Sequence, residues 1–241
     1  MEDLKYLLER KSMRSFQEKT IPKDIKEKLF EATLRAPTAG NMMMYSILEI
    51  TDQKIKDQLV KTCDNQGFIG KSPLVLVFLA DFQRWMDFLE ASGIKEYNLE
   101  NNLEEYCPNE GDLFLSINDA LIAAQNSVIA GEILGLGSCY IGDIMENFEI
   151  HKDLLNLPKY TFPITMLCFG YPTEQQKNRP KRNRYKKEFI IFENKYKRLT
   201  DIEFKEFDDN ALHMYKRKIT SSFMKEMGRS IRAGINSWIS K

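Results

Sequence analysis

One stretch constrains the fold of this chain more than any other, residues 112–142, DLFLSINDALIAAQNSVIAGEILGLGSCYIG. Apolar residues recur there at helical spacing with alanines between them, which predicts one long helix whose apolar face is too wide for a surface helix. The repeat is set by Leu113, Ile117, Leu121, Ala124, Val128 and Leu134. We therefore expect a core helix, in which polar side chains need hydrogen-bonding partners. Its polar exceptions are Asp119, Gln125, Asn126 and Glu132.

Glycines follow this predicted helix closely. Gly135 and Gly137 come directly after its last apolar repeat, where glycine commonly ends a helix. A short apolar segment, 139–141, then leads to Gly142. Because glycine has no side chain, such a turn lets a ligand approach the backbone closely.

The remaining elements alternate between helix and strand. Continuous apolar runs predict core strands at 74–80 and 162–170, and a further strand is expected at 45–50. Apolar spacing predicts helices at 3–10, after Pro22, and at 52–63, with Thr51 or Asp52 as the N-cap of the last. Residues 81–111 are polar and mixed, and we expect them to be a mainly helical insertion.

Composition excludes several classes of protein. The 241 residues carry no net charge, with 43% apolar and 29% charged residues, so no global basic bias points to nucleic acid. The longest apolar run, 74–80, is too short to cross a bilayer, and the N-terminus lacks an apolar signal core. Four cysteines without CxxC spacing and only two histidines predict no metal site and favour a reducing cytoplasm.

Two familiar motifs are matched only in part. Gly135-x-Gly137 has Tyr140 where a dinucleotide-binding fingerprint needs its third glycine, and it follows a helix instead of a strand. Residues 70–72, GKS, resemble the end of a phosphate-binding loop, but Pro73 prevents the helix that should follow. No GxSxG elbow is present. The basic run at 177–187 leaves RNA binding open as an alternative, although Tyr185 is its single aromatic residue.

Three separate segments remain as candidate binding residues. The first contains Arg10, Lys11, Ser12 and Arg14; the second is the loop 37–41; the third contains Arg182 and Arg184. Arginine binds phosphate oxygens in pairs through its planar fork, so two arginine clusters in a neutral protein could converge on one phosphate.

These blocks together resemble the FMN-dependent nitroreductases. The resemblance rests on RKSMRSF at 10–16, APTAGN at 36–41, Gln66 within CDNQGFIGKSP, the helix and glycine turn of 117–142, FGYP at 169–172 and the basic pair at 182 and 184. Met42, Met43 and Met44 depart from the family pattern, in which a Gln-Pro pair is common there. The tail, FMKEMGRSIRAGINSW, is similar to a subgroup with a long C-terminal extension, so the resemblance covers nearly the whole chain.

The resemblance implies an α+β fold, a three-layer sandwich with a central, mostly antiparallel sheet flanked by helices. It further implies an intertwined, obligate homodimer with two FMN molecules at the subunit interface. Residues 1–241 would form a single domain, in which the extension at about 174–241 packs on the body or on the partner subunit.

The resemblance also implies where FMN would bind. Arg10, Ser12, Arg182 and Arg184 would meet the phosphate, and Arg14 the pyrimidine edge of the ring, where reduction places negative charge. Gln66 would bond the ring or the ribityl chain, and a backbone N–H at Gly142 would approach flavin N5. Pro37, Thr38, Ala39 and Asn41 would come from the other subunit, and Lys11, Tyr140 and Ile141 complete the predicted set.

The implied function is FMN-dependent, NAD(P)H-driven reduction of nitro compounds, quinones or related small-molecule acceptors by a two-electron ping-pong mechanism in the cytoplasm. The cofactor carries the chemistry, so no catalytic acid–base side chain is required. Flavin reduction, ene reduction and reductive dehalogenation are alternatives on the same fold. A non-catalytic flavin- or RNA-binding protein is the alternative from another class.

Overall fold

The computed structural model describes residues 4–207 and 222–240. They belong to two compact units, one formed by Met1–Arg179 with Met227–Lys241 and the other by Pro180–Glu226. The single domain expected for 1–241 stays a prediction, and the stretch 208–221 of the expected extension lies outside the described residues. Everything about the sheet and the candidate site below concerns the first unit.

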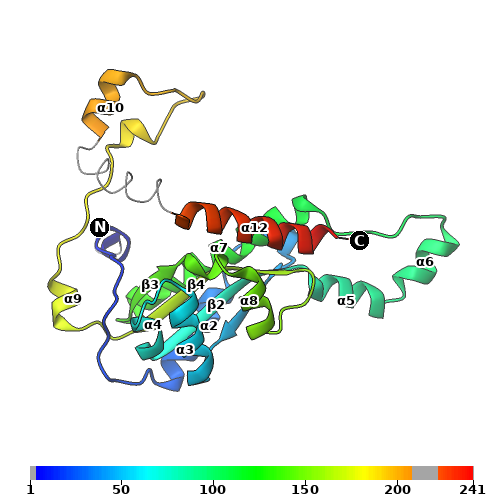
Figure 1. Ribbon diagram of the computed structural model, residues 1–241, viewed down its shortest axis with the longest axis horizontal. Helices are drawn as coiled ribbons and strands as arrows, with labels where there is room; N and C mark the ends of the chain where they lie inside the picture. The colour runs from blue at the N-terminus through cyan, green and yellow to red at the C-terminus, as the bar shows by residue number, and fades with distance from the viewer. Residues whose placement is uncertain (1–3, 208–221, 241) are drawn as a thin grey trace. The chain divides into compact units, whose positions relative to one another are not determined.

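A four-stranded antiparallel sheet forms the centre of the first unit (Figure 1). Its strands are β1 (Tyr45–Glu49), β2 (Leu74–Asp81), β3 (Gly137–Ile141) and β4 (Thr161–Gly170), in the order β1-β2-β4-β3. The two central strands, β2 and β4, are buried along their whole length, as their continuous apolar sequences predict. The expected antiparallel sheet is confirmed.

Helices cover both faces of the sheet, which gives the three layers. Leu74, Leu76 and Phe78 of β2 pack in one cluster with residues of α2 (Lys23–Leu34) and α7 (Glu110–Ile133). The intervening Val75 and Val77 pack in a second cluster with residues of α3 (Gln53–Thr62) and α4 (Phe68–Lys71). This alternation follows from the two-residue period of a strand.

The remaining described elements are short, apart from the C-terminal helix. α5 (Gln83–Ala91) and α6 (Ile94–Glu100), the predicted helical insertion, project from the sheet at the right of Figure 1. The second unit holds η4 (Lys187–Phe189) and α10 (Asp201–Phe207). The others are α1 (Lys5–Leu8), η2 (Ala39–Asn41), η3 (Asp143–Met145), α8 (Phe148–Leu154), α9 (Glu174–Asn178) and α12 (Ser222–Ile239).

The end of α12 packs on the body of its own chain. The backbone N–H of Phe148 donates to the Ser230 hydroxyl at 2.8 Å, and Trp238 is buried. Gly234 lies flat against Phe162: a Cβ at this position would come within 1.9 Å of the ring. This glycine therefore sets how closely the helix can approach the sheet.

The long helix α7 ends as its sequence predicts, and its start is capped. Asn109 and Asp112 form a capping box at its start, and Gly135, with φ +76°, follows its end in the left-handed conformation. By length and composition α7 could cross a membrane, but half of its apolar window is buried within the fold.

One expectation for α7 is only half correct. Within a single chain, one side of the helix keeps an exposed apolar stripe, which we call the α7 stripe, instead of being buried all round. Leu121, placed on the predicted core face, is 41% exposed. The sequence pattern does not distinguish side chains that pack inside the chain from those that face outward. The α7 stripe comprises Phe114, Leu115, Leu121, Ile122 and Ile133.

Candidate functional site

Two glycines bring the arginine-rich segment 10–14 against the sheet. A Cβ at Gly137 would lie 2.6 Å from Cγ of Met13, and one at Gly170 would lie 2.7 Å from Cγ of Phe16. Gly137 and Gly170 are register partners across β3 and β4, so Met13 and Phe16 fit over the space that they leave. The backbone N–H of Met13 also donates to the carbonyl of Ser138 at 2.8 Å. The segment 10–14 therefore lies beside β3.

Three guanidinium groups gather near β3. Burial raises the pKa of the Cys139 thiol, and the charges of Arg14, Arg10 and Arg179 oppose that rise. Arg179 also donates from its guanidinium to the carbonyl of Ser12. Arg179 was not among the residues predicted from the sequence, although it lies within the basic run at 177–187, which was the available signal. Arg182 and Arg184, chosen instead, belong to the second unit, and their part in the site stays a prediction.

Lys11 is engaged with the chain that follows the sheet. Its ammonium group donates to the carbonyl of Lys177 at 2.5 Å and to that of Arg179. The cation therefore holds the segments 10–14 and 177–179 together, which is a structural task that the sequence did not reveal. Its predicted part in cofactor binding is not tested by these contacts.

The C-terminal end of α7 also meets the arginine-rich segment. Burial raises the pKa of Glu132 to about 7, while the charges of Arg10 and Lys11 oppose the rise. Oε1 of Glu132 is buried, and no described residue gives it a hydrogen bond. Burial likewise raises the pKa of Tyr140 to about 12, and its hydroxyl donates to Oε1 of Gln125 at 3.3 Å. This end of the helix holds a buried carboxyl beside cations.

Gly142 opens onto free space at the end of β3. A Cβ built at this glycine would meet nothing within 4 Å, and its φ of −78° is one that any residue adopts. The glycine therefore leaves its backbone accessible without being required by the conformation. Ile141, immediately before it, is buried and fixes the turn to the core.

Gln66 lies next to this turn with its amide group oriented. Nε2 of Gln66 donates to Oδ2 of Asp143 at 2.6 Å and to the carbonyl of Cys63 at 3.1 Å. Both N–H groups of the side chain are thereby used. What remains for a ligand is the amide oxygen, so Gln66 can only accept a hydrogen bond there.

The 37–41 loop is fixed to a different part of α7. The carboxylate of Asp119, which is buried, accepts from the backbone N–H groups of Ala39 at 2.9 Å and Met44 at 3.1 Å. Asn41 has φ +58°, in the left-handed region, and its side chain is exposed, as is that of Pro37. The expected partner for the polar Asp119 is confirmed, and the loop presents its polar side outward.

A single chain does not bring these two regions together. The 37–41 loop sits at Asp119, whereas Arg10 and Lys11 sit at Glu132. Thirteen residues of α-helix separate the two positions, which is about 20 Å at about 1.5 Å per residue. Arg10, Ser12, Arg14, Tyr140 and Ile141 therefore form one group in the chain, and the 37–41 loop forms another.

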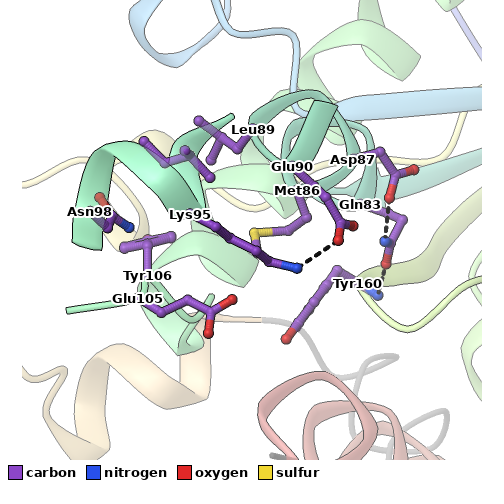
Figure 2. Close-up of a pocket in the computed structure, with 11 residues that line it drawn as sticks. Gln83, Met86, Asp87, Leu89, Glu90, Lys95, Asn98, Glu105, Tyr106 and Tyr160 are labelled. Carbon is purple, nitrogen blue, oxygen red and sulfur yellow. Dashed lines mark hydrogen bonds and ion pairs between the residues drawn. The ribbon is translucent and has the colours of Figure 1, made fainter. Parts of the chain in front are cut away.

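A cavity of about 190 Å³ lies elsewhere in the first unit, between α5, α6 and the chain that follows them (Figure 2). An exposed ion pair, Lys95 with Glu90 at 2.6 Å, lies in its wall. None of its lining residues belongs to the predicted cofactor site, so it is a separate hollow. It is lined by Gln83, Met86, Asp87, Leu89, Glu90, Ile94, Lys95, Asn98, Glu105, Tyr106 and Tyr160.

Comparison with known proteins decides what kind of fold carries these groups. Residues 7–171 match the nitroreductase family. The chain belongs to the nitroreductase family. This confirms the resemblance drawn from the motifs, and the matched residues include both the arginine-rich segment and the glycine turn.

Relatives and solved structures agree with that membership. This nitroreductase-family chain is 30% identical over 195 residues to an "FMN reductase (NADPH)" of Bacillus subtilis, covering 81% of the chain and 74% of the relative. It is 28% identical over 205 residues to an "oxygen-insensitive NADPH nitroreductase" of Salmonella typhimurium, covering 85% and 79%. The structure of the NfrA1 nitroreductase from B. subtilis superimposes with a TM-score of 0.76 at 27% identity, covering 90% and 85%.

Proposed function

We propose that the chain binds FMN and uses NADPH or NADH to reduce nitro compounds, quinones or related small molecules in two-electron, ping-pong steps. The observation that carries the proposal is the pairing of three arginines beside β3 with the open backbone at Gly142, in a member of the nitroreductase family. When bound, FMN supplies the hydride chemistry. The names of the relatives, an NADPH-dependent FMN reductase and a nitroreductase, support this activity.

The groups present fit the chemistry of that cofactor. Arg10 and Arg179 offer guanidinium forks suited to a phosphate, and Ser12 adds a hydroxyl beside them. Arg14, which is exposed, is the cation that we assign to the ring edge. Gln66 would accept a hydrogen bond from the ring or the ribityl chain, and the open backbone at Gly142 leaves room for the ring.

A second copy of the chain would complete the site. The 37–41 loop and the arginine-rich segment lie at positions of α7 about 20 Å apart along the helix, too far to line one small site. If two copies pair antiparallel through the α7 stripe, the loop of one copy moves next to the arginines of the other. The exposed apolar side chains of that stripe favour such pairing, since large apolar patches mark interfaces. We therefore propose an obligate homodimer with two sites.

Reduction of free flavin is the second candidate function. One specific observation favours it, the 30% identity to a relative named "FMN reductase (NADPH)". In that case the acceptor would itself be a flavin, and the same bound FMN would pass the electrons on.

Four cysteines without a disulfide support a reducing compartment, and we place the protein in the cytoplasm.

The test begins with the colour of the purified protein. We expect a yellow protein that releases FMN on heating and whose flavin absorbance bleaches when NADPH is added without oxygen. A panel of nitro compounds, quinones and free flavins against the reduced protein then ranks the acceptors. A protein that takes up no FMN on titration contradicts the proposal, and a flavoprotein that NADPH and NADH both fail to reduce contradicts the enzymatic part.

A further inference from the structure

The glycine turn, residues 142–147, is tied to the end of α3 by side chains from both sides. Gln66 donates to Asp143 at 2.6 Å, and Nδ2 of Asn147 donates to the carbonyl of Thr62 at 2.8 Å. A third link comes from His151 of α8, whose side chain is completely buried. Its two ring nitrogens contact the turn on one side and α3 on the other.

The geometry settles which ring nitrogen carries the proton. Nδ1 of His151 lies 2.7 Å from the carbonyl oxygen of Ile144, which can only accept, so Nδ1 is the donor. Burial lowers the pKa of His151, which keeps the ring neutral at pH 7. Nε2 is then an acceptor, 2.8 Å from the Thr62 hydroxyl. That hydroxyl also donates toward the carbonyl of Gln58, at 3.0 Å, so its proton is shared between two acceptors.

We infer that His151 is a positioning residue, which holds the turn at Gly142 to α3 and so sets where the exposed backbone of that glycine stands. The inference rests on the proposed function, in which Gly142 borders the FMN ring. The neutral imidazole bridges two partners on different elements: a carbonyl in the turn and a hydroxyl at the end of α3. An apolar side chain at this position would take away the hydrogen bond that the Ile144 carbonyl accepts from Nδ1.

The two sides of the turn differ, because Ile144 packs one side into the core whereas Gly142 lies on the accessible side. Gly142 is exposed and has open space where its Cβ would be. Within the turn, the N–H of Met145 bonds to the carbonyl of Gly142, which fixes its shape but not its position. A binding surface held in place beforehand binds more tightly, because less order has to be imposed when the ligand arrives.

Three substitutions of His151 separate its two contacts. His151→Phe keeps a ring of similar size and removes both nitrogens. His151→Asn places an amide N–H near the position of Nδ1 and can keep the bond to Ile144, whereas His151→Gln can reach Thr62 and loses Ile144. Thr33→Val is the matched control: it removes a buried hydroxyl that bonds the carbonyl of Leu29 inside α2, away from the turn.

The measurements are amide hydrogen exchange of the protein without FMN, the FMN dissociation constant, and the flavin midpoint potential at full occupancy. We expect His151→Phe to speed amide hydrogen exchange in the peptide containing 142–147 and to shift the flavin midpoint potential. It should also weaken FMN binding about tenfold, as the loss of a buried hydrogen bond implies. The exchange rate, the FMN affinity and the midpoint potential of His151→Asn should all lie closer to wild type than those of His151→Gln. Thr33→Val should lower the melting temperature and leave these three readouts unchanged.

The possible failures are distinguishable. If the wild-type protein binds no FMN, the proposed function fails, and this inference falls with it. If the wild type binds FMN but His151→Phe matches Thr33→Val in exchange at the turn, affinity and potential, the proposed function stands and the positioning role is refuted. If His151→Phe does not fold, His151→Asn and His151→Gln decide: equal, wild-type-like potentials and affinities in both would also refute it.

Discussion

Two carboxyl groups on α7, Asp119 and Glu132, have opposite surroundings. Asp119 accepts hydrogen bonds from two backbone N–H groups and so completes the 37–41 loop within one chain. Glu132 lies beside Arg10 and Lys11, has an oxygen without a partner among the described residues, and has a pKa raised to about 7. The carboxylate at the loop end is therefore paired within one chain, whereas the carboxyl group at the arginine end keeps an oxygen unpaired among the described residues. This difference supports the proposal that a ligand and a second copy complete the arginine end.

The largest effect should come from separating the two copies. Leu121→Glu places a charge in the centre of the α7 stripe, which should abolish dimers and FMN binding together if the two regions meet across the interface. Light scattering with flavin absorbance measures both. The control is Leu99→Glu on α6, a side chain that is 80% exposed and lies off the stripe. A monomeric Leu121→Glu protein that still binds FMN would refute the shared site.

The next largest effect should come from weakening the hydrogen bonds that Asp119 accepts from the 37–41 loop and from Met44. Asp119→Asn keeps one acceptor oxygen but turns an N–H group toward a backbone donor, which should lower the free energy of unfolding by about 2–3 kcal/mol. Urea denaturation measures this, with Glu110→Gln as the control that removes an exposed charge from the same helix. An equal stability loss in both variants would show that the loop does not depend on Asp119.

Substitutions of Arg10 and Arg14 should change the affinity for FMN and the midpoint potential of the bound flavin. Arg10→Ala should weaken FMN binding roughly ten- to hundredfold by removing a charge-assisted phosphate contact, and Arg10→Lys should restore it only in part. Arg14→Ala should instead lower the flavin midpoint potential at full occupancy, because its cation stabilises the negative charge of the reduced ring. Potentials and dissociation constants of both variants decide. A potential that shifts with Arg10 and not with Arg14 would reverse the two roles.

The smallest effect concerns pH. Because the folded-state pKa of Glu132 is raised to about 7 from its usual 4.5, the folded protein retains a proton that the unfolded chain has lost between these values. Stability should therefore fall as pH rises from about 4.5 through about 7, and Glu132→Gln should flatten that slope. Melting temperatures of both proteins across this range, without FMN, measure it. An unchanged slope in the variant would place the titration elsewhere.

The sequence predicted the fold well where local pattern decides it. The continuous apolar runs of β2 and β4, the N-cap Asp52 of α3 and the left-handed Gly135 after α7 were all recognisable. In contrast, the exposure of the α7 stripe was not, because an apolar side chain has the same pattern whether its partner lies in the same chain or in another.

Only those residues of the candidate site that lie within sequence motifs could be predicted from the sequence. The arginine-rich segment and Gly142 were found from residue types and spacing, and the structure places both at β3. Arg179 was missed because one basic run offers several arginines and only the path of the chain selects among them. His151 was missed because a buried histidine between a carbonyl and a hydroxyl has no signature in the sequence.

The central claim is that each FMN site takes the arginines of one chain and the 37–41 loop of the other, and a mixed dimer tests it most directly. Arg10→Ala damages the first half, and Asn41→Gly removes a loop side chain while suiting the φ of +58° at that position. Each variant alone should bind FMN weakly at both sites. A heterodimer of the two, purified with different tags, should bind one FMN per dimer with the wild-type affinity, because one site is then intact and the other carries both changes. Two weak sites per heterodimer, with no site of wild-type affinity, would show that each FMN site is built within a single chain.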